Sequence, residues 1–73
     1  DKTRITIMHR NVPNMIGQIS AILAEDGINI SDMTNKSKKE YAYTMIDVEN
    51  EITEEIVKDL EKIKEVLRVR VIA

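Results

Sequence analysis

The strongest constraint on the fold is the regular alternation of side chains from Tyr41 to Glu49. One face of this segment carries Ala42, Thr44, Ile46 and Val48. The other face carries Tyr41, Tyr43, Met45, Asp47 and Glu49. A period of two predicts a strand that is buried on one side only. Such strands are typical of antiparallel sheets that are covered by helices on one face.

Two patterns precede this strand. Residues 4–9 alternate and predict a first strand, which Asn11-Val12-Pro13-Asn14 interrupts. Apolar side chains then recur at helical spacing from Met15 to Ala24, and Pro13 suits the first turn of this helix. Gly27 stands where a helix commonly ends in a left-handed residue.

The remaining segments predict two further strands and a helix. Residues 28–36 begin as a strand and become polar, which indicates a sheet edge, and residues 37–39 are expected to form a hairpin turn. Thr53 is a suitable N-cap for a second helix, whose apolar stripe ends at Ile63. Residues 66–72 predict the last strand. Its apolar side chains, opposite Arg68 and Arg70, are Leu67, Val69 and Val71.

The order of these elements is strand, helix, strand, strand, helix, strand. It predicts an α+β fold, the ferredoxin-like βαββαβ sandwich, with a four-stranded antiparallel sheet in the order 4-1-3-2 and two helices on one face. A chain of 73 residues has room for a single core, so residues 1–73 are expected to form one domain. Because no initiator Met precedes Asp1, we expect this domain to come from a longer protein.

Composition argues against several classes of function. The chain has no Cys, which excludes disulfide scaffolds, thiolate metal sites and thiol catalysis. Its formal charge of −2, with acids and bases interleaved, argues against nucleic acid and membrane surfaces as partners. No apolar run approaches the ~18 residues of a membrane span. A signal sequence is not recognised either, so we expect a cytoplasmic domain.

No catalytic motif is evident. RNA-recognition sheets carry several aromatic side chains, whereas this chain has no Phe or Trp and its two Tyr residues lie on one predicted strand. An acylphosphatase-like phosphate cradle needs a glycine-rich loop, which the residues after Arg10 do not supply. His9 is the only histidine, and no motif joins it to a serine and an aspartate. We therefore expect a domain without catalytic residues, cofactors or metal ions.

Polar side chains gather where the first strand meets the first helix, in His9-Arg10-Asn11-Val12-Pro13. A helix N-terminus exposes unpaired N–H groups that suit a carboxylate. The imidazole of His9 and the amide of Asn11 can add specific hydrogen bonds. Each residue also has a structural interpretation: His9 as a packed strand end, Asn11 as a helix cap and Asn29 as a turn residue. Their combination favours a site for a small polar ligand.

Two stretches of the chain resemble an ACT domain. They are Ile7-Met8-His9-Arg10-Asn11-Val12-Pro13-Asn14-Met15-Ile16 and Ile22-Leu23-Ala24-Glu25-Asp26-Gly27-Ile28-Asn29-Ile30. More narrowly, they resemble the C-terminal regulatory domains of D-3-phosphoglycerate dehydrogenases, as does the later segment from Tyr43 to Glu49. Asn14 departs from the pattern, because the family usually has Gly at this position.

The resemblance implies a function. Such domains bind L-serine between two copies and give feedback control of an NAD-dependent dehydrogenase, whose NAD lies outside this domain. The implied ligand residues are His9, Asn11 and Asn29, with Val12, Pro13, Asn14 and Met15 in support. The implied homodimer pairs the edge strand 28–35 of each copy. The alternative is a structural dimerisation domain of an amino-acid-metabolism enzyme that binds no ligand.

Overall fold

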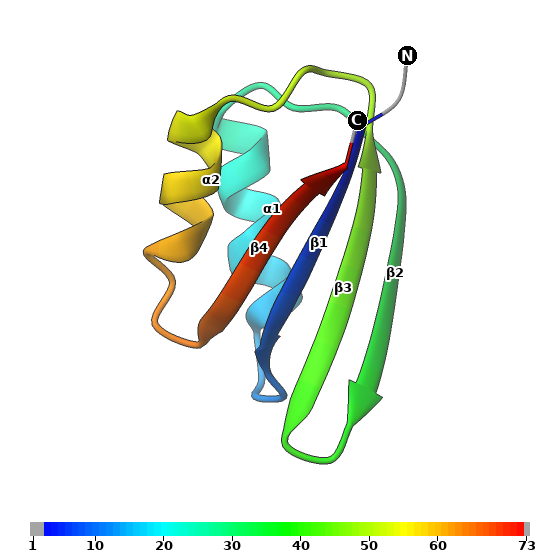
Figure 1. The fold of residues 1–73 in the computed structure, drawn as a ribbon, viewed down its shortest axis with the longest axis vertical. Helices are drawn as coiled ribbons and strands as arrows, with labels where there is room; N and C mark the ends of the chain where they lie inside the picture. Colours follow the sequence, from blue (N-terminus) through cyan, green and yellow to red (C-terminus); the bar gives the residue numbers. More distant parts are fainter. Residues whose placement is uncertain (1–2, 73) are drawn as a thin grey trace.

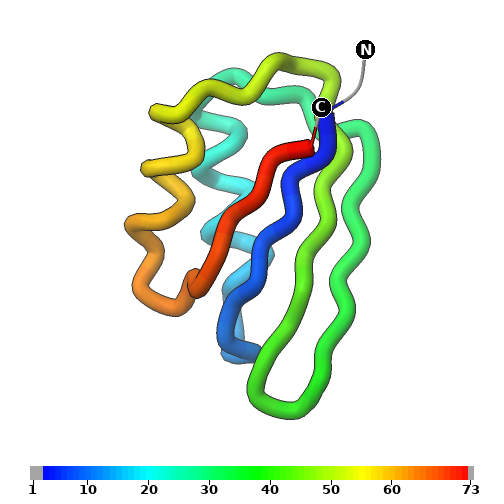
Figure 2. Tube along the Cα trace, viewed as in Figure 1, coloured from blue at the N-terminus to red at the C-terminus, as the bar shows by residue number. Residues whose placement is uncertain are grey.

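A computed structural model describes residues 3–72 of the chain. Its elements, in order, are β1 (Thr3–Arg10), α1 (Met15–Glu25), β2 (Ile30–Lys38), β3 (Tyr41–Val48), α2 (Glu54–Glu61) and β4 (Val66–Ile72). All neighbouring strands pair antiparallel, and both helices lie on one face of the sheet (Figure 1). The sheet order is β2-β3-β1-β4, which confirms the predicted ferredoxin-like sandwich and its two edge strands. Figure 2 shows β1 running between β3 and β4.

The core lies between the sheet and the two helices. Every apolar or hydroxyl side chain on the inner face of β3 is buried, whereas Tyr41 and Tyr43 on its outer face are exposed. The alternation predicted for this strand is therefore confirmed. The other fully buried side chains are Ile5, Ile7, Ile19, Leu23 and Leu60. In the described part of the chain, neither helix has the length and apolar character needed to cross a membrane.

The end of α1 delays the start of β2. The N–H of Gly27 donates to the carbonyl of Ala24 at 3.1 Å, and the N–H of Ile28 donates to that of Leu23 at 2.9 Å. With a φ of 72° at Gly27, these bonds form a Schellman motif. Ile28 therefore closes the helix, and β2 begins at Ile30, two residues later than predicted.

The hairpin between β2 and β3 is shorter than predicted. Both strands continue further, so the turn consists of Lys39 and Glu40 instead of residues 37–39. Lys39 has a φ of 52°. Two-residue hairpin loops favour a positive φ at their first position, because that twist matches the twist of the strands. Lysine is not a typical residue for this backbone, which is why the sequence pattern placed the turn too early.

β4 has the predicted bounds, but its pairing with β1 is irregular at Leu67. The register shifts between Met8 and His9, and Leu67 has no partner in β1. Leu67 is 47% exposed, whereas Val69, opposite Ile7, packs against the core. A bulge inserts one residue and breaks the alternation. The predicted regular alternation of Leu67 with Val69 and Val71 is therefore interrupted at Leu67.

Candidate functional site

His9 is a buried polar side chain with both ring nitrogens engaged. The ring is 2% exposed at the end of β1. Nε2 lies 2.8 Å from Oγ1 of Thr44, and Nδ1 lies 2.8 Å from the carbonyl oxygen of Arg10. A carbonyl only accepts, so Nδ1 carries a hydrogen and donates it. An effector that contacts His9 must therefore replace one of these two partners.

A hydrogen-bond relay joins His9 to the edge strand. Oγ1 of Thr44, which lies 2.8 Å from Nε2 of His9, donates to Oδ1 of Asn35 at 2.9 Å. The relay therefore runs from the end of β1 across β3 to β2.

Asn11 ties the loop after β1 to the β2–β3 hairpin. Its backbone N–H donates to the carbonyl of Glu40 at 2.8 Å, and Nδ2 donates to that of Lys39 at 3.0 Å. The predicted alternative, Asn11 as the cap of α1, is not found, because the N-cap residue is Asn14. One hydrogen of Nδ2 remains for a ligand.

The N-terminus of α1 lacks both a side-chain cap and an acidic residue. Asn14 makes no side-chain hydrogen bond to the helix, and the first turn contains no Asp or Glu. α2 is the opposite case. There Thr53 accepts from the N–H of Ile56 at 3.4 Å, and Glu54 and Glu55 occupy the first turn. The start of α1 therefore keeps its N–H groups and the positive end of its dipole for an anion.

The backbone of Asn14 explains the departure from the family pattern. Asn14 has a φ of 66° and a ψ of 18°, a left-handed conformation that Gly and Asn adopt most easily. Its side chain lies against Gly17, where a Cβ would collide with Oδ1. Asn14 and Pro13 form the turn before the helix, which begins at Met15. The prediction that Pro13 lies in the first helical turn is therefore wrong.

The supporting residues divide into two groups. Val12, Pro13 and Asn14 are exposed beside the start of α1, so a ligand can reach them. Met15 is only 3% exposed and belongs to the core. It supports the site from below and has little surface for a ligand.

Asn29 lies at the far end of the sheet from His9 and Asn11. The N–H of Glu49 donates to the carbonyl of Asn29 at 3.1 Å, and the N–H of Asn29 donates to Oδ1 of Asn50 at 2.7 Å. These bonds hold Asn29 at the end of β3, whereas Asn11 sits by its start. The length of β1 separates the two ends, roughly 23 Å at the usual rise of a strand. Within one chain the three predicted residues are not brought together.

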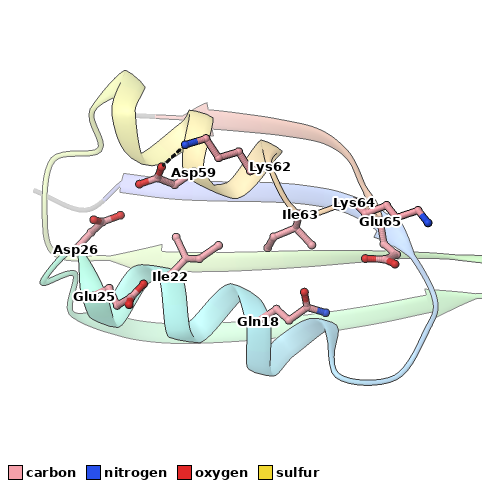
Figure 3. A pocket seen from close by; sticks show the side chains of 9 residues that line it. All are labelled: Gln18, Ile22, Glu25, Asp26, Asp59, Lys62, Ile63, Lys64 and Glu65. Carbon is pink, nitrogen blue, oxygen red and sulfur yellow. Dashed lines mark ion pairs between the residues drawn. The ribbon is translucent and has the colours of Figure 1, made fainter.

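A separate hollow lies between the two helices. This groove measures about 510 Å³ and lies between α1 and α2 (Figure 3). Its lining residues are Gln18, Ile22, Glu25, Asp26, Asp59, Lys62, Ile63, Lys64 and Glu65. Carboxylates predominate among its charged side chains, which disfavours the carboxylate of an amino acid. Within residues 3–72, no group of His, Asp and Glu is arranged to hold a metal ion.

An ion pair joins β1 and β3 at the end of the sheet where Asn29 lies. Nε of Arg4 donates to Oδ1 of Asp47 at 2.8 Å, and its Nη2 donates to Oδ2 at 3.1 Å. These hydrogen bonds and the charge of Asp47 raise the pKa of Arg4. The pair is exposed, so its contribution to stability is small.

Comparisons with known proteins agree on the fold. A family model described as AHAS small subunit-like ACT domain matches residues 5–68. The ACT domain from GTP pyrophosphokinase of Chlorobium tepidum is 18% identical, with a TM-score of 0.81 over 97% of this chain and 96% of that chain. The acetolactate synthase small subunit from Thermotoga maritima is 23% identical, with a TM-score of 0.82 over 97% of this chain and 47% of that chain.

A third similar structure is the ligand-free regulatory subunit of aspartate kinase from Thermus thermophilus. It is 18% identical, with a TM-score of 0.72 over 96% of this chain and 50% of that chain. This chain thus spans about half the length of the last two proteins. No curated protein sequence gives a significant match.

Proposed function

Because this chain belongs to the AHAS small subunit-like ACT domains, we propose that it is a regulatory domain that senses a free amino acid. ACT domains are non-catalytic modules that bind small-molecule effectors in amino-acid metabolism, and they generally dimerise. The identity of the effector, its contacts and the strand that forms the dimer are the finer parts of the proposal.

The observation that carries the proposal is the start of α1, which has neither a side-chain cap nor an acidic residue. The carboxylate of an amino acid binds to the N–H groups of this turn and to the second hydrogen of Asn11 Nδ2. Val12, Pro13 and Asn14 line the approach. The ammonium group then needs an acceptor, which we assign to the side-chain oxygen of Asn29 from a second copy.

The exposure of the edge strand β2 supports that assignment, because this strand can pair with its copy in a second chain. β2 is exposed along almost its whole length and pairs with β3 on one side. If two β2 strands pair antiparallel about an axis at Thr34, Ile30 lies opposite the partner's Lys38. Asn29 then lies beside the partner's Lys39, whose carbonyl accepts from the partner's Asn11 by the bond described above. Asn29 and Asn11, which lie far apart within one chain, are thus close to each other between two chains.

L-serine is the first effector to test, with D-3-phosphoglycerate dehydrogenase as the parent enzyme. This choice rests on the resemblance of His9, Asn11 and Asn29 to the serine contacts of that enzyme. The hydroxyl of L-serine would replace Thr44 at Nε2 of His9. The matching family model is named after a different enzyme, so an amino acid with a hydrocarbon side chain is the second class to test. Such a ligand would leave the bond between His9 and Thr44 intact.

Isothermal titration with each of the common amino acids tests the proposal. We expect one of them to bind, and Asn11→Ala and Asn29→Ala each to weaken its binding at least tenfold. Lys62→Ala is the control, because its side chain lies in the groove between the helices and contacts none of the proposed ligand residues. If no amino acid binds to a dimeric preparation, the sensor proposal fails.

The burial of His9 favours a second candidate, a structural dimerisation domain without a ligand. Both ring nitrogens already have partners within the chain, so this histidine is satisfied without an effector. This candidate predicts a dimer whose thermal midpoint does not respond to any amino acid, whereas a ligand of the folded dimer raises the midpoint. Thermal denaturation with each amino acid separates the two candidates.

A further inference from the structure

The open face of the sheet, opposite the helices, has a charge unlike that of the whole chain. The register places six cations on it: Arg4, Arg10, Lys36, Lys38, Arg68 and Arg70. Among the residues of the four strands, two anions accompany them: Asp32 and Asp47. Six positive and two negative charges give this face a net charge of +4, although the chain carries −2. The low overall charge thus conceals a basic surface that attracts anions.

A hollow of about 260 Å³ lies in the open face. Thr6, Met8, Tyr43, Arg68 and Arg70 line it. Met8 pairs with Tyr43 on one side and with Arg68 on the other, so these side chains form a row across β3, β1 and β4. Thr6 and Met8 are half-buried and form the floor of the hollow.

The two arginines of the hollow have no acidic partner among residues 3–72. Arg68 and Arg70 leave the same face of β4 at positions roughly 7 Å apart, because they are two residues apart on a strand. Arg4 on the same face is instead paired with Asp47. Neighbouring guanidinium groups repel each other until an anion lies between them, and their planar donors bind phosphate in a bidentate manner.

Tyr43 supplies a different surface at the other end of the row. Its side chain is 39% exposed and belongs to β3, two strand spacings or roughly 10 Å from Arg68. An exposed tyrosine ring offers a flat face on which a planar group stacks. Met8 between the two adds an apolar and adaptable floor. The hollow thus has an anion-binding end and a ring-binding end.

We propose that this hollow binds a ligand in which a planar ring is joined to a phosphate, as in a nucleotide. The site lies on the face of the sheet away from α1, and it does not depend on the proposed amino-acid site. The same chemistry has two sources, a free mononucleotide and a segment of single-stranded nucleic acid. Lys36 and Lys38 extend the basic surface beyond Tyr43 and would contact the further phosphates of a strand.

Titration by NMR with AMP, adenosine, inorganic phosphate and a short oligoadenylate tests the site. We expect AMP to bind at least tenfold more tightly than adenosine or phosphate, with shifts centred on Met8 and Tyr43. Tighter binding of the oligoadenylate, with a steep dependence on salt, would support the site and identify a strand as its source. Equal binding of phosphate and AMP, or no binding of either, would overturn the proposal.

Three variants sharpen the test. Arg68→Gln and Tyr43→Leu change exposed side chains, and each is expected to weaken AMP binding about tenfold, the loss of a good charged or stacking contact. Tyr43→Leu should leave the weak binding of phosphate unchanged. Lys58→Gln, on α2 and thus away from the open face, is the matched control. Two results would show that the surface binds polyanions without specificity and that the proposal is wrong. One is that Lys58→Gln weakens binding as much as Arg68→Gln. The other is that polyglutamate displaces the oligoadenylate as well as AMP does.

Discussion

At the scale of single residues, the hydrogen bond from His9 to the carbonyl of Arg10 fixes a proton. Because that carbonyl only accepts, Nδ1 carries a hydrogen in both the neutral and the charged ring. We expect ¹⁵N NMR of the folded chain to report a hydrogen on Nδ1 of His9. A neutral ring with its hydrogen on Nε2 alone would contradict this arrangement.

Thr44→Val tests the other partner of His9. The substitution keeps the shape of the side chain but leaves a buried nitrogen without its partner, which costs about 1–3 kcal/mol of unfolding free energy. Urea denaturation followed by circular dichroism measures the loss. Thr3→Val is the matched control, since Thr3 lies half-buried at the start of β1, far from His9, and its effect should stay within about 0.5 kcal/mol. Equal losses in the two variants would refute the role assigned to Thr44.

The sequence indicates the chemistry of His9 but not its surroundings. A histidine beside Asn11 and Pro13 suggests a ligand contact, because the side-chain types are visible in the sequence. Its burial and its bond to Thr44, 35 residues away, depend on the pairing of β1 with β3. The placement of Asn29 at the opposite end of the sheet likewise follows only from the register.

At the scale of elements, the start of α1 depends on a fit between Asn14 and Gly17. Alanine normally stabilises a helix by about 1 kcal/mol relative to glycine. Here the new Cβ of Gly17→Ala would meet Oδ1 of Asn14, so we expect this gain to be largely lost. In the background of Asn14→Gly the gain should return. Thermal denaturation of the four proteins in a double-mutant cycle measures the coupling.

Gly27→Ala is the control for that cycle. Nothing lies within 4 Å of a Cβ at Gly27, but its φ of 72° is strained for alanine. The expected loss is about 1–2 kcal/mol and independent of Asn14. If Gly17→Ala is as stabilising in the natural chain as in the Asn14→Gly chain, the proposed fit is absent.

Local signals explain which elements the sequence predicts well. β3, β4 and the cap of α2 rest on alternation and on Thr53, and their expected positions match the structure closely. Ile28 suits both a strand and the apolar contact of a Schellman motif, and only the hydrogen bonds decide between them. The bulge at Leu67 follows from the pairing of β4 with β1, which no local pattern reveals.

At the scale of the whole molecule, the sheet has two edges but only one proposed interface. β2 and β4 each pair with one strand in the described part of the chain. We expect hydrogen exchange of the outward amides of β2 to slow as concentration rises and the dimer forms, because they then gain partners. The outward amides of β4 should exchange at an unchanged rate. Slower exchange at β4 alone would show that β4 forms the interface and would contradict the proposed pairing of β2.

The two bonds that Asn11 makes to residues 39 and 40 have a mechanical consequence. They connect the loop that would bind the effector to the end of β2, the strand that would pair with the second copy. A displacement of this loop is therefore transmitted to the hairpin directly through one residue, Asn11, and not through the hydrophobic core. Ligand binding and dimerisation would then be coupled through Asn11.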